Sequence, residues 1–344
     1  MRVGNRDYKV GTGLSIFLAI SVLSVLAIFF LTADTGSWRD FRRISPGHAA
    51  LAGLLMVTQW CLNALRFKIL LNRLDNDVSF GTSFKAFMSN VFMSAITPSQ
   101  TGGGPMQIYV LSRSGVSIAR AFAGCLMGAV LTVVGLLSTT LAILIFSPGF
   151  REELGRHLAG VLLAAAIVFS LLASLFLLSL FRIDLVKQLV GRSLLVILRF
   201  LRTERRLAFT KRVLRGIDQY RESIAMFGRA RKRRVVLALL VTLACLATNS
   251  LIAPVLIDGL GVDQNFSATY MAQPILFFIA YFGPTPGASG IAEFSNYWML
   301  TSLDIDPGML GIYTVLWRIF TIFIGVAVGG LVILSIIPRA RRAS

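Results

Sequence analysis

Two charged residues that could take part in chemistry lie in or beside apolar stretches in the last fifth of the sequence. Glu293 follows a Gly/Pro-rich interruption by three residues, and Arg318 lies inside the final apolar stretch. Ionisable side chains in such surroundings are costly to bury, and they commonly mark substrate or ion pathways. Two interpretations remain open. Either the two residues form a structural ion pair, or Arg318 binds a phosphate group while Glu293 positions it or takes up a proton.

A second set of polar residues recurs within an apolar stretch of the first third. Gln59, Asn63 and Arg66 are spaced by four and then three residues, so a helix would place them on one face. The arginine could meet an anion from this face. The alternative is that its long side chain only extends to a membrane surface.

A glycine run precedes two further polar candidates. Gly102–Gly104 stands at the predicted start of a helical limb, and Gln107 and Arg113 follow it. Backbone N–H groups at a helix start bind anions readily, so the run could form an anion cradle. For Arg113, as for the earlier arginine, reaching the membrane surface is the alternative interpretation.

Enzymatic chemistry finds little support in the sequence. Gly287–Gly290 reads as the GxSG of rhomboid-type intramembrane proteases, but a serine nucleophile needs a partner base. His48 and His157 both lie outside the apolar stretches, and the three cysteines lie far apart with no metal-binding spacing. We therefore expect no catalytic residue, no metal and no cofactor.

The candidate residues cluster around two interruptions in otherwise apolar stretches. Phe84–Leu111 is broken at Thr97–Pro105, and Tyr270–Leu303 is broken at Gly283–Gly290. Each limb is shorter than the roughly 20 residues that a membrane-crossing helix needs. Proline and glycine leave backbone groups that cannot face lipid unpaired. We expect a pair of re-entrant helical hairpins whose tips line a polar cavity; the alternative is a pair of kinks that only aid packing.

The rest of the chain supplies membrane-spanning segments. Hydrophobic residues make up 56% and charged residues 15%, whereas a soluble chain has about 45–50% and about 25%. Six apolar stretches are long enough to cross a bilayer. They are residues 13–31, 49–71, 117–146, 159–181, 234–256 and 311–337.

The net charge of +18 follows the predicted topology. With the amino terminus inside, 28 of the 34 Lys and Arg residues fall on the cytoplasmic side, which predicts that both termini are cytoplasmic. The segment 182–234 carries sixteen of them against four acids, and its apolar residues recur at helical spacing. It is either an amphipathic segment bound to anionic inner-leaflet headgroups or ordinary positive-inside charge. Because the bases follow topology, we expect no nucleic-acid partner.

The two halves of the chain correspond. Each broken segment follows one full span and precedes a longer one. The charge bias gives these two span–break–span units opposite orientations in the membrane. This pattern predicts an inverted-topology repeat with the substrate site at the breaks. The domain organisation is a single transmembrane domain over 1–344. It comprises the first span and repeat one (12–146), a connecting span (147–181), the basic cytoplasmic segment (182–234), repeat two (235–337) and a basic cytoplasmic tail (338–344).

The two breaks carry a family resemblance. Thr97–Leu111 and Pro284–Glu293, the latter with the pattern P-x-P-G-x-x-G-x-x-E, resemble the transmembrane region of lysylphosphatidylglycerol synthases. The resemblance implies a flippase-like integral membrane protein of the stand-alone type, which lacks an aminoacyl-transferase domain. The motif residues that it implies are Pro98, Gly102, Gly103, Pro286, Gly287, Gly290 and Glu293. Many relatives carry an acid and a base where this chain has Gly104 and Gln107, a departure that argues against a lysyl headgroup.

These observations predict an all-α polytopic inner-membrane protein with six transmembrane helices and two re-entrant hairpins. We expect a lipid translocase that moves an anionic phospholipid or an isoprenoid-type lipid between leaflets. The alternative is a non-transporting scaffold for a partner enzyme of lipid modification or glycosyl transfer. The candidate substrate-binding residues are Arg66, Thr97, Pro98, Gly102, Gly103, Gly104, Gln107, Arg113, Pro284, Pro286, Gly287, Gly290, Glu293 and Arg318.

Overall fold

The computed structural model describes residues 44–72, 78–153 and 232–336, together with six single helical positions in the segments 15–23 and 171. Apart from those positions, the predicted spans 13–31 and 159–181 lie outside the described residues. So do the tail 338–344 and all but the last three residues of the basic segment 182–234.

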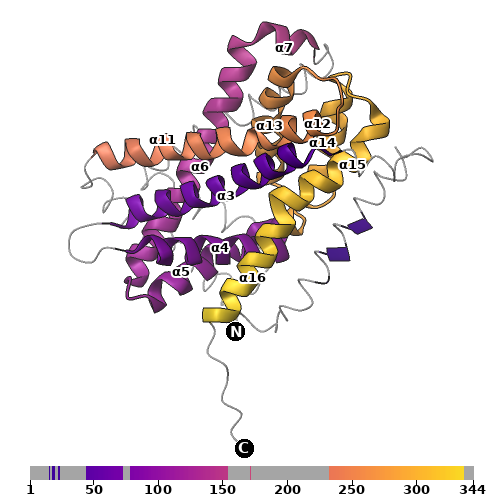
Figure 1. The fold of residues 1–344 in the computed structure, drawn as a ribbon. Coiled ribbons are helices and arrows are strands. Elements are labelled where there is room, and N and C mark those ends of the chain that lie inside the picture. The colour runs from indigo at the N-terminus through magenta and orange to yellow at the C-terminus, as the bar shows by residue number, and fades with distance from the viewer. Residues whose placement is uncertain are drawn as a thin grey trace, which may run out of the picture.

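Every regular element in the described ranges is helical (Figure 1). In chain order the elements are α3 (Pro46–Leu71), α4 (Phe80–Ile96), η2 (Pro98–Gln100), α5 (Gly103–Arg113), α6 (Ile118–Phe146), α7 (Pro148–Glu153), α11 (Lys232–Ser250), α12 (Ile252–Gly259), α13 (Phe266–Tyr281), η4 (Pro286–Ala288), α14 (Ile291–Thr301), α15 (Pro307–Arg318), η5 (Ile319–Phe323) and α16 (Ile324–Ile336).

The four predicted spans within the described ranges are confirmed. Helical stretches long and apolar enough to cross a membrane run over Pro46–Leu71, Ile118–Phe146, Arg233–Gly259 and Gly308–Ile336. The third consists of α11 and α12, and the fourth consists of α15, η5 and α16. Large apolar side chains such as Leu54, Phe146 and Leu334 are exposed on their outer faces. An outer surface of this kind suits a lipid environment, in which apolar side chains need not be buried against protein.

Local sequence sets the helix boundaries. Ser79 and Ser117 cap α4 and α6, because each side-chain oxygen accepts a hydrogen bond from the backbone N–H three residues on. Asn265 caps α13 in the same way. α11 ends at Ser250, four residues before Pro254, whose missing N–H cannot bond the Ser250 carbonyl.

Each predicted break separates two helices, and the two breaks share one backbone geometry. The tips read Thr97-Pro98-Ser99-Gln100 and, 188 residues later, Thr285-Pro286-Gly287-Ala288. In both tips a threonine with extended backbone precedes a short 3-10 turn, and the two residues after the proline have positive φ. This match supports the predicted correspondence between the halves.

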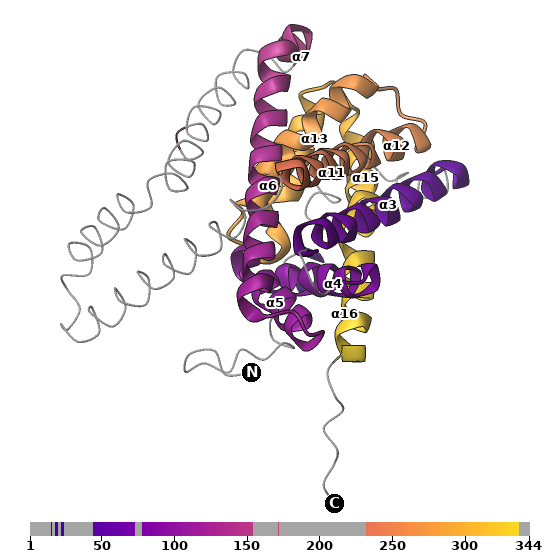
Figure 2. The same cartoon turned by 90° about the vertical axis from the view of Figure 1, so that its left-hand side faces the viewer.

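The two tips, η2 and η4, lie against each other. The backbone N–H of Ser99 donates to the carbonyl oxygen of Pro284 over 3.2 Å. α4 packs on α5, and α13 packs on α14, so each unit folds back on itself. In Figure 2, α6 runs alongside the bundle, in contact with α5, α11 and α13.

Two spans carry glycine pairs spaced by four where another helix approaches closely. On α6, Gly124 and Gly128 face α3. On α16, Gly325 and Gly329 face α4, and a Cβ added to Gly329 would lie 2.3 Å from the backbone oxygen of Met88. Such small-residue pairs let membrane helices approach at backbone distance. The α16 pair lets the first broken segment pack closely against the last span, and the α6 pair brings two full spans together.

The last span is interrupted by a π-helical turn, η5, directly after Arg318. The backbone N–H of Ile324 bonds to the carbonyl of Ile319, five residues back. The Thr321 hydroxyl donates to the carbonyl of Trp317 over 2.6 Å. π-turns occur frequently at functional sites.

Candidate functional site: a polar cavity between the two tips

A cavity of about 560 Å³ lies where the tips meet the spans. Its walls come from α3, α4, α5, α6, α11, α13 and the α15–η5 junction as well as both tips, so both halves of the chain contribute. The polar residues that line it are Gln59, Asn63, Arg66, Asn90, Ser94, Ser99, Gln100, Gln107, Thr132, Thr242, Asn249, Tyr281, Arg318 and Thr321. Its size falls within the range of small-molecule sites.

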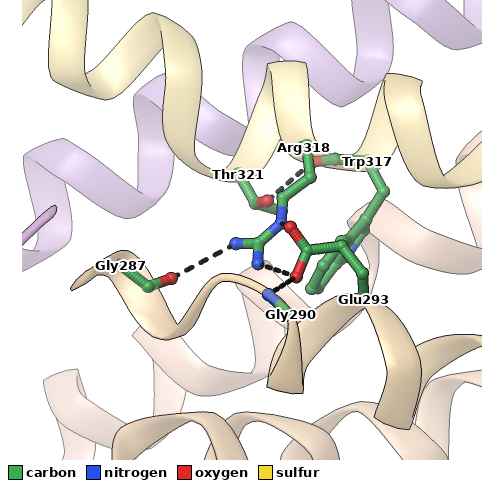
Figure 3. A network of polar contacts seen from close by, with 6 residues as sticks. All are labelled: Gly287, Gly290, Glu293, Trp317, Arg318 and Thr321. Atoms are coloured by element: carbon green, nitrogen blue, oxygen red, sulfur yellow. Dashed lines mark hydrogen bonds and ion pairs between the residues drawn. The ribbon is translucent and has the colours of Figure 1, made fainter. Parts of the chain in front are cut away.

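Arg318 and Glu293 form a buried, bidentate ion pair (Figure 3). Arg318 Nε donates to Glu293 Oε1 over 2.8 Å, and Nη2 lies 2.6 Å from Oε2. The carboxylate is fully buried and the arginine is 3% exposed. Arg318 Nη1 also donates to the carbonyl of Gly287 over 3.4 Å, which ties the last span to the second tip. The pairing that the sequence left as one interpretation is therefore present, and the carboxylate offsets the arginine's charge.

Glu293 also fixes the start of α14. Its Oε2 accepts the backbone N–H of Gly290 over 2.7 Å, so the carboxylate caps the helix while it pairs with the guanidinium (Figure 3). Gly290 has φ 87°, a conformation that residues with a Cβ rarely adopt. The spacing G-x-x-E thus serves the local backbone geometry of the second tip.

Arg66 is the second buried guanidinium of the cavity, and its partners are neutral. Nη1 donates to the Thr132 hydroxyl over 2.8 Å and, over 3.5 Å, to that of Thr242. Each hydroxyl donates its own hydrogen to a helix carbonyl, of Gly128 and Ala238 respectively, so its oxygen is left to accept. Arg66 is 6% exposed, and no carboxylate among the described residues pairs with it.

Hydrogen bonds between polar side chains connect α4 to α5 on the cavity wall. Asn90 Nδ2 donates to Gln107 Oε1 over 3.3 Å, and the Ser94 hydroxyl donates to Asn90 Oδ1 over 3.4 Å. Gln107 is 2% exposed, and its Nε2 has no hydrogen-bond partner among the residues that the structure describes. A buried donor without a partner is costly, so the position favours an acceptor supplied by a ligand.

The glycine run of the first tip differs from the predicted anion cradle. The N–H of Gly102 already donates to the Thr97 hydroxyl over 2.9 Å. Gly103 is buried against α4, where an added Cβ would lie 2.0 Å from Ser94 Oγ, whereas Gly104 lines the cavity with nothing within 4 Å of that position. The predicted cradle of three N–H groups is therefore wrong in one respect, because the N–H of Gly102 is not available to an anion. The run mainly permits close packing.

This geometry predicts opposite outcomes for two adjacent substitutions. Gly103→Ala should lower the free energy of unfolding by about 1–2 kcal/mol, because the new methyl group overlaps α4. Gly104→Ala, the matched control, should be neutral or slightly stabilising because alanine favours helix. Thermal unfolding of the detergent-purified variants measures both. Equal stabilities would contradict the packing role of Gly103.

The remaining predicted site residues fall into two groups. Pro98 and Pro284 are exposed tip residues, while Pro286 and Gly287 are buried. Arg113 is exposed at the end of α5 and does not line the cavity. Of the two arginines predicted in the first half, the structure brings only Arg66 to the site.

Several lining residues were not among the predicted candidates. Asn90, Ser94, Thr132, Thr242 and Asn249 each lie in a helix that is otherwise largely apolar. Isolated polar residues within apolar spans are the signal that could have identified them. Within the described ranges, no group of three or more His, Cys, Asp or Glu residues could hold a metal ion.

Fold and site together define a polytopic helical membrane protein with a polar cavity between two broken segments. The chain belongs to the family of the lysylphosphatidylglycerol synthase TM region, whose family model matches residues 14–329. It is similar to a UPF0104 membrane protein of Archaeoglobus fulgidus, with 27% identity over 304 residues, which cover 88% of this chain and 91% of that relative. The predicted family membership is confirmed.

Proposed function

We propose that the protein moves a lipid with an anionic headgroup, a phospholipid or an isoprenoid-type lipid, between membrane leaflets. One observation carries the proposal: a polar cavity with two buried guanidinium groups lies inside a bundle whose outer surface is apolar. Such a cavity gives a headgroup a path that lipid tails cannot provide, because polar groups in hydrocarbon are costly. The family membership supports the same function.

The proposed arrangement places the two broken segments as re-entrant hairpins of an inverted repeat. α4 has 17 residues and α13 has 16, which correspond to roughly 25 Å of helix at 1.5 Å per residue. That length falls short of the roughly 30 Å hydrocarbon core. The shared tip geometry supports equivalent roles for the two units. Alternating access would then arise from movement of one repeat against the other.

The proposed setting is the cell (inner) membrane, with both termini in the cytoplasm. Its basis is the Lys/Arg bias, and we propose on the same basis that the basic segment 182–234 meets anionic inner-leaflet headgroups. The same basic segment favours the second candidate function, a non-transporting scaffold that recruits a partner lipid-modifying enzyme.

A reversible cross-link between the tips separates the two functions. Ser99 and Pro284 are joined by a backbone hydrogen bond, so Ser99→Cys with Pro284→Cys puts one cysteine on each of two touching backbone segments, and loss of free thiols on oxidation shows that the disulfide has formed. The background replaces the three native cysteines by alanine. The assay follows fluorescent phosphatidylglycerol in proteoliposomes, with an impermeant quencher reporting the outer leaflet.

Transport should stop when the pair is oxidised and return on reduction, because the tips must separate for the cavity to change sides. Each single-cysteine variant is the control and should be insensitive to oxidant. A reduced double variant with no transport at all, alongside an active cysteine-free parent, would show that the substitutions themselves are harmful. Equal rates in the oxidised and reduced protein would contradict alternating access at the tips, and absence of flipping by the parent would favour the scaffold.

A further inference from the structure

We infer that the cavity selects a phosphate ester whose headgroup is hydroxylated and carries no cationic group, and that Arg66 is the residue that binds the phosphate. The inference rests on the proposed function, which leaves the headgroup open beyond its negative charge. It is carried by the unequal charge balance of the two guanidinium groups and by the chemistry of the cavity wall.

The two arginines of the cavity differ in what neutralises them. Both oxygens of the Glu293 carboxylate are engaged by Arg318, so this pair contributes little net charge. Among the described residues, the hydrogen-bond partners of Arg66 are two hydroxyls, both reached through Nη1, and its guanidinium also lies 5.3 Å from the centroid of the Phe67 ring. A buried cation without a counter-ion is strongly unfavourable. No described carboxylate balances the charge of Arg66, and a phosphate would neutralise it.

Two residues that line the cavity carry buried donor atoms without a described partner. Arg66 Nε and Gln107 Nε2 both lack a hydrogen-bond partner within the described ranges, and both residues line the cavity and are less than a tenth exposed. Two donors of this kind require acceptor atoms. Phosphate and hydroxyl oxygens supply acceptors, whereas an ammonium group supplies only donors.

The rest of the polar wall is made of uncharged groups that suit a polyol. The lining contains carboxamides, which can donate and accept at once, and hydroxyls; the carboxamides are Gln59, Asn63, Asn90, Gln100, Gln107 and Asn249. No carboxylate belongs to the lining among the described residues. An aminoacyl or amine headgroup would thus meet Arg66 without an anion to pair with. A glycerol, inositol or sugar phosphate would find partners for its phosphate and its hydroxyls.

Binding of defined lipids to the detergent-purified chain, measured by native mass spectrometry, tests the selection without any transport assay. The hydroxylated anionic probes are short-chain phosphatidylglycerol and phosphatidylinositol, with a mannosyl-phosphoryl polyprenol to distinguish a diacyl from an isoprenoid source. The comparison probes are lysyl-phosphatidylglycerol, phosphatidylcholine, phosphatidate and a neutral glucosyl-diacylglycerol. At least one hydroxylated anionic probe should bind about 10-fold or more tightly than every comparison probe.

Arg66→Gln should weaken binding of the preferred probe about 10- to 100-fold, the range for loss of a charged hydrogen-bond partner. Arg66→Lys should retain part of the affinity, and the exposed Arg113→Gln is the matched control with wild-type affinity. If Arg66→Gln fails to fold, the ranking of the probes by the wild-type protein still tests the inferred selectivity.

Several results would overturn the inference. Lysyl-phosphatidylglycerol or phosphatidylcholine binding as tightly as the hydroxylated anions would refute the exclusion of cations. Equal binding of phosphatidate would refute recognition of the hydroxyls, and unchanged binding to a folded Arg66→Gln variant would refute the role of this residue. Selective binding by a protein that moves no lipid would contradict the proposed transport function but not the inferred selectivity of the cavity.

Discussion

Glu293→Gln should destabilise the protein strongly, by about 3–5 kcal/mol in the free energy of unfolding, because it leaves a buried charge without its partner. Glutamine can still accept the Gly290 N–H, so the cap of α14 remains. What is lost is the charge that balances Arg318, a guanidinium that is 3% exposed. Denaturant unfolding of the purified protein measures the loss. The exposed Glu152→Gln is the matched control and should leave stability unchanged.

A double variant separates the structural role of this pair from a role in transport. Glu293→Gln with Arg318→Met removes both charges, so much of the lost stability should return. If the pair also takes part in transport, the stable double variant should still bind lipid but should flip it more slowly than the parent. Wild-type flipping by the double variant would assign the pair to structure alone. A single variant as stable as the parent would contradict the buried-charge argument altogether.

Gly329→Ala should also have a large effect, a loss of about 3 kcal/mol, at the upper end of the range for overpacking. The added Cβ would lie 2.3 Å from the Met88 backbone oxygen and 3.0 Å from Phe92 Cβ. A backbone atom cannot turn aside as a side chain can, so α16 would have to move away from α4. Thermal unfolding in detergent measures the loss.

The neighbouring glycine provides the control for this contact. A Cβ at Gly330 would meet only the ring of Phe92, at 3.2 Å, and the ring can shift by a few tenths of an ångström. Gly330→Ala should therefore cost much less than Gly329→Ala. Because α4 carries part of the cavity wall, Gly329→Ala should also slow transport, whereas Gly330→Ala should not. Similar losses for both would show that α16 has room to move.

The sequence predicted the elements well where hydropathy and backbone chemistry decide them. The described spans agree with the predicted ones to within a few residues at their ends, and the breaks fall at the expected prolines. Proline and glycine act through the local backbone, so their effect can be predicted without knowledge of the fold. The proximity of Glu293 and Arg318 could also be anticipated, since both had to be neutralised at depth.

The composition of the cavity could not be predicted in the same way. Arg66 contacts hydroxyls 66 and 176 residues further along the chain, and those pairings depend on which faces of three helices converge. The same limit explains why Arg113, equally basic and next to the first break, lies outside the site. Helix rotation within the bundle decides both cases, and it is set by packing contacts such as Gly128 against Phe67.

The π-turn in the last span has a consequence for the phase of that helix. Residues eleven apart in an unbroken α-helix, about three turns of 3.6 residues, point in almost the same direction. Arg318 and Gly329 are eleven apart, yet one lines the cavity and the other lies against the Met88 backbone. The extra residue accommodated in η5 offsets the two halves of the span by roughly 100°. A single helix can thereby direct a guanidinium toward the second tip and a glycine toward the first broken segment.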